Sequence, residues 1–204
     1  MRKNKKITII MALICALLIS VNLPLNSSKN AFNEETGDVE VLNDSIIIEF
    51  ISPKDSIKNE LINEAERYIF GNYPKTNKEI PTLIVEQGLE NEVDIMFMMA
   101  QTQIETSYGT AGAGRETSRR SLFGVAIRKY QTYEKAITDY IRILREYYLT
   151  RGRTEQHLMN KYTTSGGARY ASNPNYEAEL RSAYNGIKNK TNIRGLQEQY
   201  KNIF

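Results

Sequence analysis

Carboxylates are the side chains with which this sequence could do chemistry. Cys15 is the single cysteine and His157 the single histidine. A Ser-His-Asp triad could use only His157, and a zinc site would lack its usual ligands. Gly109, Gly112 and Gly114 are followed by no lysine and preceded by no predicted strand, so they form no phosphate-binding loop of the Walker type. We therefore expect acid–base chemistry by carboxylates, with no metal and no cofactor.

Glu105 is the carboxylate in the most promising position. It falls in the last turn of a predicted helix, one residue off the apolar face. The carbonyl end of a helix carries partial negative charge, and apolar neighbours exclude water, so both effects favour the protonated acid. A general acid in glycoside cleavage must be protonated near neutral pH. Taken alone, such a glutamate is more often an ordinary solvated residue.

Four blocks of sequence strengthen the case for Glu105. They are Glu105-Thr-Ser-Tyr-Gly109 (preceded by Ala100-Gln101), Ser121-Leu-Phe-Gly-Val125, the tyrosine-bounded segment 133–140, and Tyr170-Ala-Ser-Asn-Pro-Asn-Tyr176. In order and rough spacing, over about residues 57–188, these blocks resemble the bacterial glucosaminidase domain family of autolysin-type peptidoglycan hydrolases. Ser121 and Asn173 depart from the family's usual Asn and Asp.

The resemblance implies a fold, an activity and a site. The fold would be an all-α or α-dominated, lysozyme-like domain with a minimal or absent β-lobe. The enzyme would cleave peptidoglycan glycan strands after N-acetylglucosamine, with Glu105 as the acid. Tyr108, Phe123, Tyr170 and Tyr176 would bind substrate. For Tyr108, stacking on a sugar and packing of the helix end are equally open.

The Leu-Phe-Gly block is expected to act mainly through packing. Leu122, Phe123 and Gly124 would hold the loop against the core and shape the floor of the cleft. The glycine would permit a close approach of the backbone.

The second carboxylate that glycosidases usually use is not evident. Family members commonly carry a β-hairpin lobe with a proposed acid after the Leu-Phe-Gly block. Here seven residues without an acid separate Val125 from Tyr133. Glu116 is the first candidate for a water-activating base, ahead of Asp139 and Glu134, although a solvent-facing loop charge is the simpler interpretation of Glu116. A substrate-assisted route would need no second acid, and neither would a lytic transglycosylase.

Helical periodicity predicts the elements that position these residues. The first helix would be capped by Asp55 or Ser56 and end at Gly71, and the second would run from Pro81 to Gly88. The third would carry Glu105, with an apolar face between positions 93 and 104 and Gly109 just past its end.

The second half of the chain is also predicted to be helical. Residues 110–120 form a flexible polar loop, and residues 132–149 a core helix in which Tyr133, Tyr140 and Tyr147 share the buried face. Weaker helical patterns occupy residues 154–162, 175–188 and 191–203.

The amino terminus predicts export. A basic start precedes the apolar residues 7–21, so residues 1–28 form a signal peptide or an uncleaved signal anchor. Residues 29–52 would be a linker, with segment 45–52 either a short strand or a segment laid on the core, and residues 53–204 the catalytic domain. Cys15 lacks the small preceding residues of a lipoprotein signal. The protein is expected to be secreted or in the cell envelope, with the leader as its one contact with a membrane.

The net charge of the residues after the leader indicates which kinds of molecule the domain could bind. Four of the 27 basic residues lie in the leader, which leaves 23 basic against 24 acidic residues in the remainder. A near-neutral domain lacks the basic face of a nucleic-acid binder. We expect a monomer whose partner is the peptidoglycan glycan strand. Two alternatives are a lytic transglycosylase on the same fold and a non-catalytic peptidoglycan-binding or structural wall protein.

Overall fold

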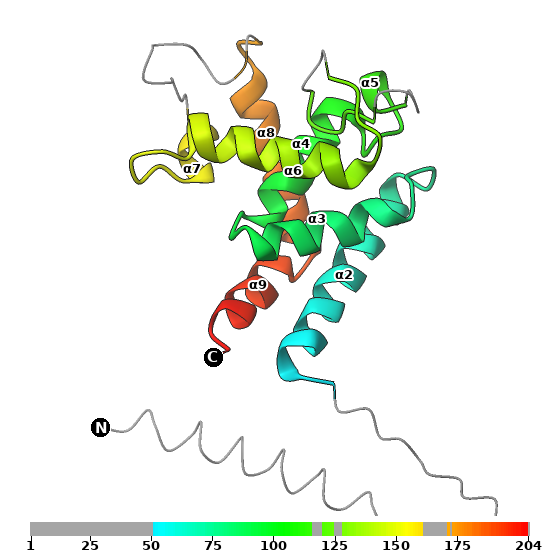
Figure 1. Cartoon of the computed structure of the whole chain (residues 1–204), viewed down its shortest axis with the longest axis vertical. Helices are drawn as coiled ribbons and strands as arrows, with labels where there is room; N and C mark the ends of the chain where they lie inside the picture. The colour runs from blue at the N-terminus through cyan, green and yellow to red at the C-terminus, as the bar shows by residue number, and fades with distance from the viewer. Residues whose placement is uncertain (1–50, 116–119, 125–127, 161–170, 172, 204) are drawn as a thin grey trace, which may run out of the picture. The chain divides into compact units, whose positions relative to one another are not determined.

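The computed structural model describes residues 51–115, 120–124, 128–160, 171 and 173–203, and every regular element in them is a helix (Figure 1). In chain order these are α2 (Pro53–Asn72), α3 (Glu79–Glu90), α4 (Ile95–Thr106), α5 (Gly112–Arg115), α6 (Tyr133–Ile143), the π-helical turn η1 (Leu144–Tyr148), α7 (Glu155–Leu158), α8 (Tyr176–Lys190) and α9 (Ile193–Lys201). No strand occurs within these ranges, which confirms the α-dominated fold.

Helix α4 is the buried centre of the domain. Residues 95–102 are all buried, and the helix packs most extensively against α8, with α3 and α9 also in contact. The Asp94 side chain accepts a hydrogen bond from the Phe97 backbone N–H (3.1 Å), which fixes the first turn. At the other end Ser107 adopts a left-handed conformation with φ +48°. The sequence predicted one apolar face, whereas the apolar run at the start of α4 is covered on every side.

Two helix ends differ from the prediction, one because of a local cap and one because of packing. Helix α2 is capped by Ser52, whose hydroxyl accepts from the Asp55 backbone N–H (3.1 Å), because Pro53 is preorganised for the first helical position. Helix α3 continues past Gly88 to Glu90. A Cβ at Gly88 would lie 2.8 Å from Ile95 Cγ1, so this glycine permits the close approach of α4 and does not end the helix.

The segment predicted as a flexible polar loop contains a short helix, α5. A Cβ at Gly114 would lie 2.7 Å from both Gly109 Cα and Thr106 Cβ. The glycine therefore lets α5 pack directly on the end of α4. Residues 116–119 of the predicted loop lie outside the described residues.

The predicted core helix 132–149 is present but changes its winding. Thr132 caps α6 by accepting from the Lys135 backbone N–H (3.2 Å), and Tyr133 and Tyr140 are buried as expected. From Leu144 the helix widens into η1, closed by a hydrogen bond from Leu149 N–H to the Leu144 carbonyl (2.8 Å). The wider turn shifts the residues that follow, so Tyr147 is 60% exposed and not in the core.

The three carboxyl-terminal helical patterns are confirmed as α7, α8 and α9, although α7 is shorter than expected. The Thr154 backbone N–H donates to His157 Nδ1 (3.1 Å), so the single histidine helps to cap α7. No helix of the described ranges is long and apolar enough to span a membrane. The leader and all but the last two residues of the linker lie outside those ranges.

Candidate active site

A cleft of about 560 Å³ lies beside the carboxyl-terminal part of α4. Its walls come from α4, α6, η1, α8 and the Leu-Phe-Gly block. The lining residues are Gln101, Ile104, Glu105, Phe123, Gly124, Tyr140, Ile143, Leu144, Tyr148, Ala171, Asn173, Tyr176 and Glu179. The volume falls within the range of small-ligand pockets.

Glu105 occupies the last turn of α4, as the sequence predicted, and is partly exposed in this cleft. Its Oε1 accepts a hydrogen bond from the hydroxyl of Tyr176 at 2.6 Å. Tyr176 is the first residue of α8 and is 7% exposed. The packing of α4 on α8 therefore brings a buried phenol to the carboxyl group.

The other carboxyl oxygen of Glu105, Oε2, lies against the backbone of Gly124. The φ of this glycine is +65°, and a Cβ there would lie 2.1 Å from Glu105 Oε2 and 2.6 Å from Cδ. The Thr106 hydroxyl donates to the Leu122 carbonyl (2.9 Å), which ties this block to the end of α4. The close backbone approach expected of Gly124 is thus confirmed, and the group that approaches is the Glu105 carboxyl.

A buried hydrogen-bonded chain leads away from Glu105. Gln101 Nε2 donates to the Tyr176 hydroxyl oxygen (3.2 Å), and the Tyr140 hydroxyl donates to Gln101 Oε1. The Tyr140 ring stacks on Phe123 with centroids 3.8 Å apart and planes inclined by 4°. One chain of contacts thus joins α6, α4 and α8 to the carboxyl group.

The predicted site residues fall into three groups. Glu105, Phe123 and Tyr176 line the cleft together. Tyr108 does not line it. Glu116 and Tyr170 lie outside the described residues.

Tyr108 is corrected from the cleft to the core. Its side chain is fully buried, with its ring tilted against Tyr73 at a centroid distance of 5.0 Å. Burial raises the pKa of the Tyr108 phenol well above its usual value. Of the two alternatives for this residue, the structure shows packing of the helix end, which leaves no ring face for a sugar.

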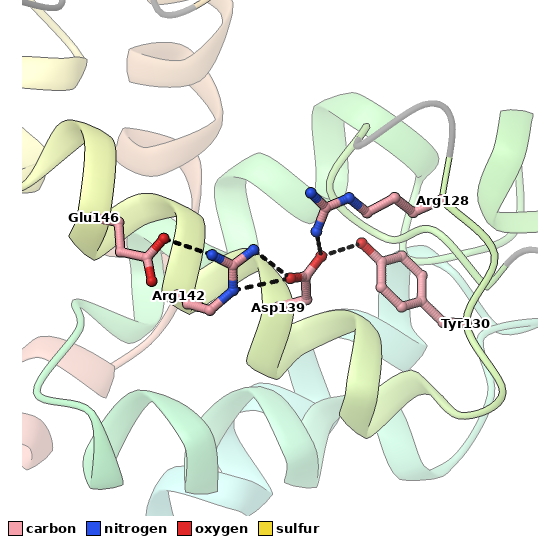
Figure 2. A network of polar contacts seen from close by, with 5 residues as sticks. All are labelled: Arg128, Tyr130, Asp139, Arg142 and Glu146. Atoms are coloured by element: carbon pink, nitrogen blue, oxygen red, sulfur yellow. Dashed lines mark hydrogen bonds and ion pairs between the residues drawn. The ribbon is translucent and has the colours of Figure 1, made fainter.

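Asp139, a reserve candidate for the second acid, lies in an ion-pair network (Figure 2). It is not among the residues that line the cleft. Its Oδ2 accepts from Arg128 (2.5 Å) and from the Tyr130 hydroxyl (2.8 Å), and its Oδ1 accepts from Arg142 (2.8 Å). Burial by itself would raise the pKa of Asp139, but the hydrogen bonds from Arg142, Tyr130 and Arg128 outweigh it, so the pKa lies below its usual value. Glu134 is exposed and is likewise absent from the cleft lining.

Glu179 is a cleft carboxylate that the sequence interpretation missed. It is exposed on α8, three residues after Tyr176. Residues three apart on a helix lie on the same side, so this spacing was a usable signal. Gln101 was missed in the same way, although it precedes Glu105 by one helical turn.

Within the described residues, no group of three or more His, Cys, Asp or Glu side chains could hold a metal ion. The cleft offers a carboxyl group, phenols, amides and apolar side chains. Such a lining suits the hydroxyl and acetamido groups of a sugar.

Comparison with known proteins agrees with this geometry. The family model described as mannosyl-glycoprotein endo-beta-N-acetylglucosaminidase matches residues 81–189, more than half of the chain. The matched range contains Glu105, Gly124 and Tyr176. No curated protein matches the chain. The match indicates a glycoside hydrolase with peptidoglycan as its substrate, and the chain belongs to the glucosaminidase family.

Proposed function

We propose that the protein is an endo-β-N-acetylglucosaminidase that cleaves the glycan strand of peptidoglycan, with Glu105 as the general acid. One observation carries the proposal. The Glu105 carboxyl lies in the cleft with Oε1 bound by Tyr176 and Oε2 against the backbone at Gly124. A proton donor held at both oxygens presents its proton in a fixed direction, which general acid catalysis requires.

The proposed reaction starts with a proton transfer. Glu105 gives its proton to the oxygen that links N-acetylglucosamine to the next sugar. The glycosidic C–O bond then breaks, and its electron pair stays on the departing oxygen. The anomeric carbon, now electron-poor, is attacked by water, and the proton of that water passes to a base.

The base is the open part of the proposal. Glu116 is proposed from its place in the sequence after the acid. Glu179 is the second carboxylate among the described residues that line the cleft. In a substrate-assisted reaction the 2-acetamido group of the sugar attacks the anomeric carbon first, so no second carboxylate is needed.

Aromatic side chains fit the proposed substrate. Tyr148, Tyr176 and Phe123 line the cleft, and sugar rings bind to such faces through their C–H groups. We propose Phe123 and Tyr176 as substrate-binding residues, together with Tyr170 from the sequence resemblance.

The central experiment compares Glu105→Gln with Asp139→Asn in the full-length chain. Each variant is incubated with purified peptidoglycan, and soluble products are measured by mass spectrometry. We expect Glu105→Gln to lower the rate by about 1,000-fold, because general acid catalysis contributes 10²–10⁴-fold. Asp139→Asn should retain activity at a temperature where it is folded. Wild-type rates in Glu105→Gln would refute the proposal.

The products test the bond and the reaction type. Hydrolysis after N-acetylglucosamine leaves that sugar at the reducing end. A lytic transglycosylase would leave an anhydro sugar, which is lighter than the hydrolysed product by one water.

Parallel variants test the base. Loss of activity in Glu116→Gln alone would assign water activation to Glu116, and loss in Glu179→Gln alone would assign it to Glu179. Full activity in both variants would support the substrate-assisted route.

A peptidoglycan hydrolase acts in the cell envelope or outside the cell. We propose that residues 1–28 direct export as a signal peptide or anchor, that residues 29–52 are a linker, and that residues 53–204 act as a monomeric catalytic domain.

A further inference from the structure

We infer that Gln101 is a positioning residue that sets the direction of the hydrogen bonds to Glu105, so that Oε2 carries the proton given to the substrate. This inference rests on the proposed function. It assigns separate tasks to the two oxygens of the acid and gives Gln101 a task that sequence alone does not reveal.

Gln101 is placed to act on the acid from within the protein. It precedes Glu105 by four residues on α4, so both side chains lie on the same side of the helix. Its side chain is 3% exposed and contacts both α6 and α8 through its amide. A buried amide held from two helices has a fixed orientation.

The two ends of the amide are chemically different. Oε1 only accepts hydrogen bonds, and Nε2 only donates them. The Tyr140 hydroxyl donates to Oε1, and stacking of its ring on Phe123 fixes the position of that hydroxyl. Nε2 therefore faces Tyr176 and donates to its oxygen at 3.2 Å.

The donation from Gln101 decides where the Tyr176 proton points. A phenol has one proton, and its oxygen here accepts from Gln101, so the proton is directed to Glu105 Oε1 at 2.6 Å. If the amide were reversed, Tyr176 would donate to Gln101 instead. The order Tyr140, Gln101, Tyr176, Glu105 is thus a chain with one direction.

The direction of this chain has a consequence for catalysis. Oε1 acts as an acceptor, so the acidic proton of Glu105 lies on Oε2, next to Gly124 in the cleft. When that O–H bond breaks and the proton joins the glycosidic oxygen, Glu105 becomes a carboxylate. The hydrogen bond from Tyr176 then becomes charge-assisted and stronger, so it stabilises the transition state more than the starting acid.

The test is a double-mutant cycle on the full-length chain, with kcat and KM measured on soluble glycan strands prepared from peptidoglycan. Gln101→Leu keeps a similar volume without donor or acceptor, and Tyr176→Phe removes the hydroxyl. We expect each to lower kcat by about tenfold and to change KM by less than about threefold, because the affected interaction strengthens in the transition state. The kcat of the double variant should lie within about twofold of the lower of the two single-variant kcat values, because both changes break the same chain of hydrogen bonds.

Gln103→Leu is the matched control. Gln103 lies on the same helix, accepts from the Tyr68 hydroxyl (3.1 Å) and lines a different depression. This variant should keep the wild-type kcat. If Gln101→Leu does not fold, Tyr140→Phe replaces it in the cycle, because it removes the donor that orients the amide.

The kcat values separate the inference about Gln101 from the proposed role of Glu105. Falls in kcat that multiply in the double variant would overturn the inference, since Gln101 would then act independently of Tyr176. An unchanged kcat in Gln101→Leu would overturn it as well. If Glu105→Gln is inactive in the same assay, either result leaves the proposed function standing; if Glu105→Gln is active, the proposed function itself fails.

Discussion

Glu105 and Asp139 are carboxylates on two different helices, and they have opposite surroundings. Glu105 contacts a phenol and the backbone at a glycine, and no ion pair within the described residues includes it. Asp139 lies between two guanidinium groups, as Figure 2 shows. Glu105 lies in the cleft, whereas Asp139 does not.

The difference shows what selects an acid for catalysis. Cations keep Asp139 ionised, so it has no proton to give, but its charge binds the segment with Arg128 and Tyr130 to α6. The neutral partner of Glu105 can hold either protonation state of the carboxyl group. Sequence spacing made both residues candidates, and their neighbours separate them.

Among substitutions of the neighbours of Glu105 and Asp139, Gly124→Ala should have the largest effect, because it displaces the Glu105 carboxyl group. The new Cβ would lie 2.1 Å from Glu105 Oε2, so the carboxyl group must move. We expect the rate on peptidoglycan to fall by about 100-fold, because a displacement of about 1 Å at a catalytic group costs that much. Gly152→Ala is the control, with φ +74° and nothing within 4 Å. Because both glycines have a positive φ, each alanine variant should lose about 1–2 kcal/mol of its free energy of unfolding. Gly152→Ala should nevertheless keep the wild-type rate on peptidoglycan. Equal rates in the two variants would contradict the placement of Glu105.

Tyr176→Phe should follow, with a fall in kcat of about tenfold, corresponding to a lost hydrogen bond to a charged group. Tyr184→Phe, on the same helix, is the matched control, because the Tyr184 hydroxyl also donates to a carboxylate, Asp94 Oδ2, at 2.7 Å. We expect Tyr184→Phe to lower the free energy of unfolding by about 1 kcal/mol and to leave kcat unchanged. A loss of kcat in Tyr184→Phe alone would reverse the assignment.

The stability of Asp139→Asn at different pH values tests the structural role of Asp139. Because the pKa of Asp139 is lowered in the folded protein, its contribution to stability is present above its ordinary pKa of 3.8 and is lost as the pH falls through the lower folded value. We expect Asp139→Asn to reduce the free energy of unfolding by about 1 kcal/mol near pH 6, the upper end for ion pairs with exposed arginines, because two arginines and a phenol bind the one carboxylate. The gap from wild type should be narrower at pH 3 than at pH 6, because pH 3 lies below the ordinary pKa of 3.8 and the contribution is lost as the pH falls toward the lowered folded value. Urea unfolding at both pH values measures it, and a gap that widens in acid would contradict the network.

Tyr148→Ala and Tyr147→Ala should give the smallest effects and would define the edge of the cleft. Tyr148 lines the cleft, whereas Tyr147 is 60% exposed. We expect Tyr148→Ala to raise KM about fivefold, corresponding to about 1 kcal/mol of aromatic contact. Tyr147→Ala should leave KM unchanged and should change the free energy of unfolding by no more than about 0.5 kcal/mol. The opposite pattern would mean that η1 does not present Tyr148 to the substrate.

The sequence predicted most helices of the described residues because their signals are local. The apolar spacing of α6 and Gly109 just past the end of α4 act within a few positions of the chain. Helix ends were less predictable. Gly88 looked like a stop, and only the approach of Ile95 shows why a glycine is needed inside α3.

The sequence by itself determined the helical class, the family and the position of Glu105 at the end of its helix, because caps, periodicity and short motifs are written in neighbouring residues. Only the tertiary structure decided that Tyr108 belongs to the core, that Tyr147 faces outward, and that Gln101, Tyr140 and Tyr176 form one chain. These outcomes depend on how α4, α6 and α8 pack, and on a π-helical turn that shifts the register after Leu144. Packing joins side chains from distant parts of the chain, and no spacing along the sequence records that contact.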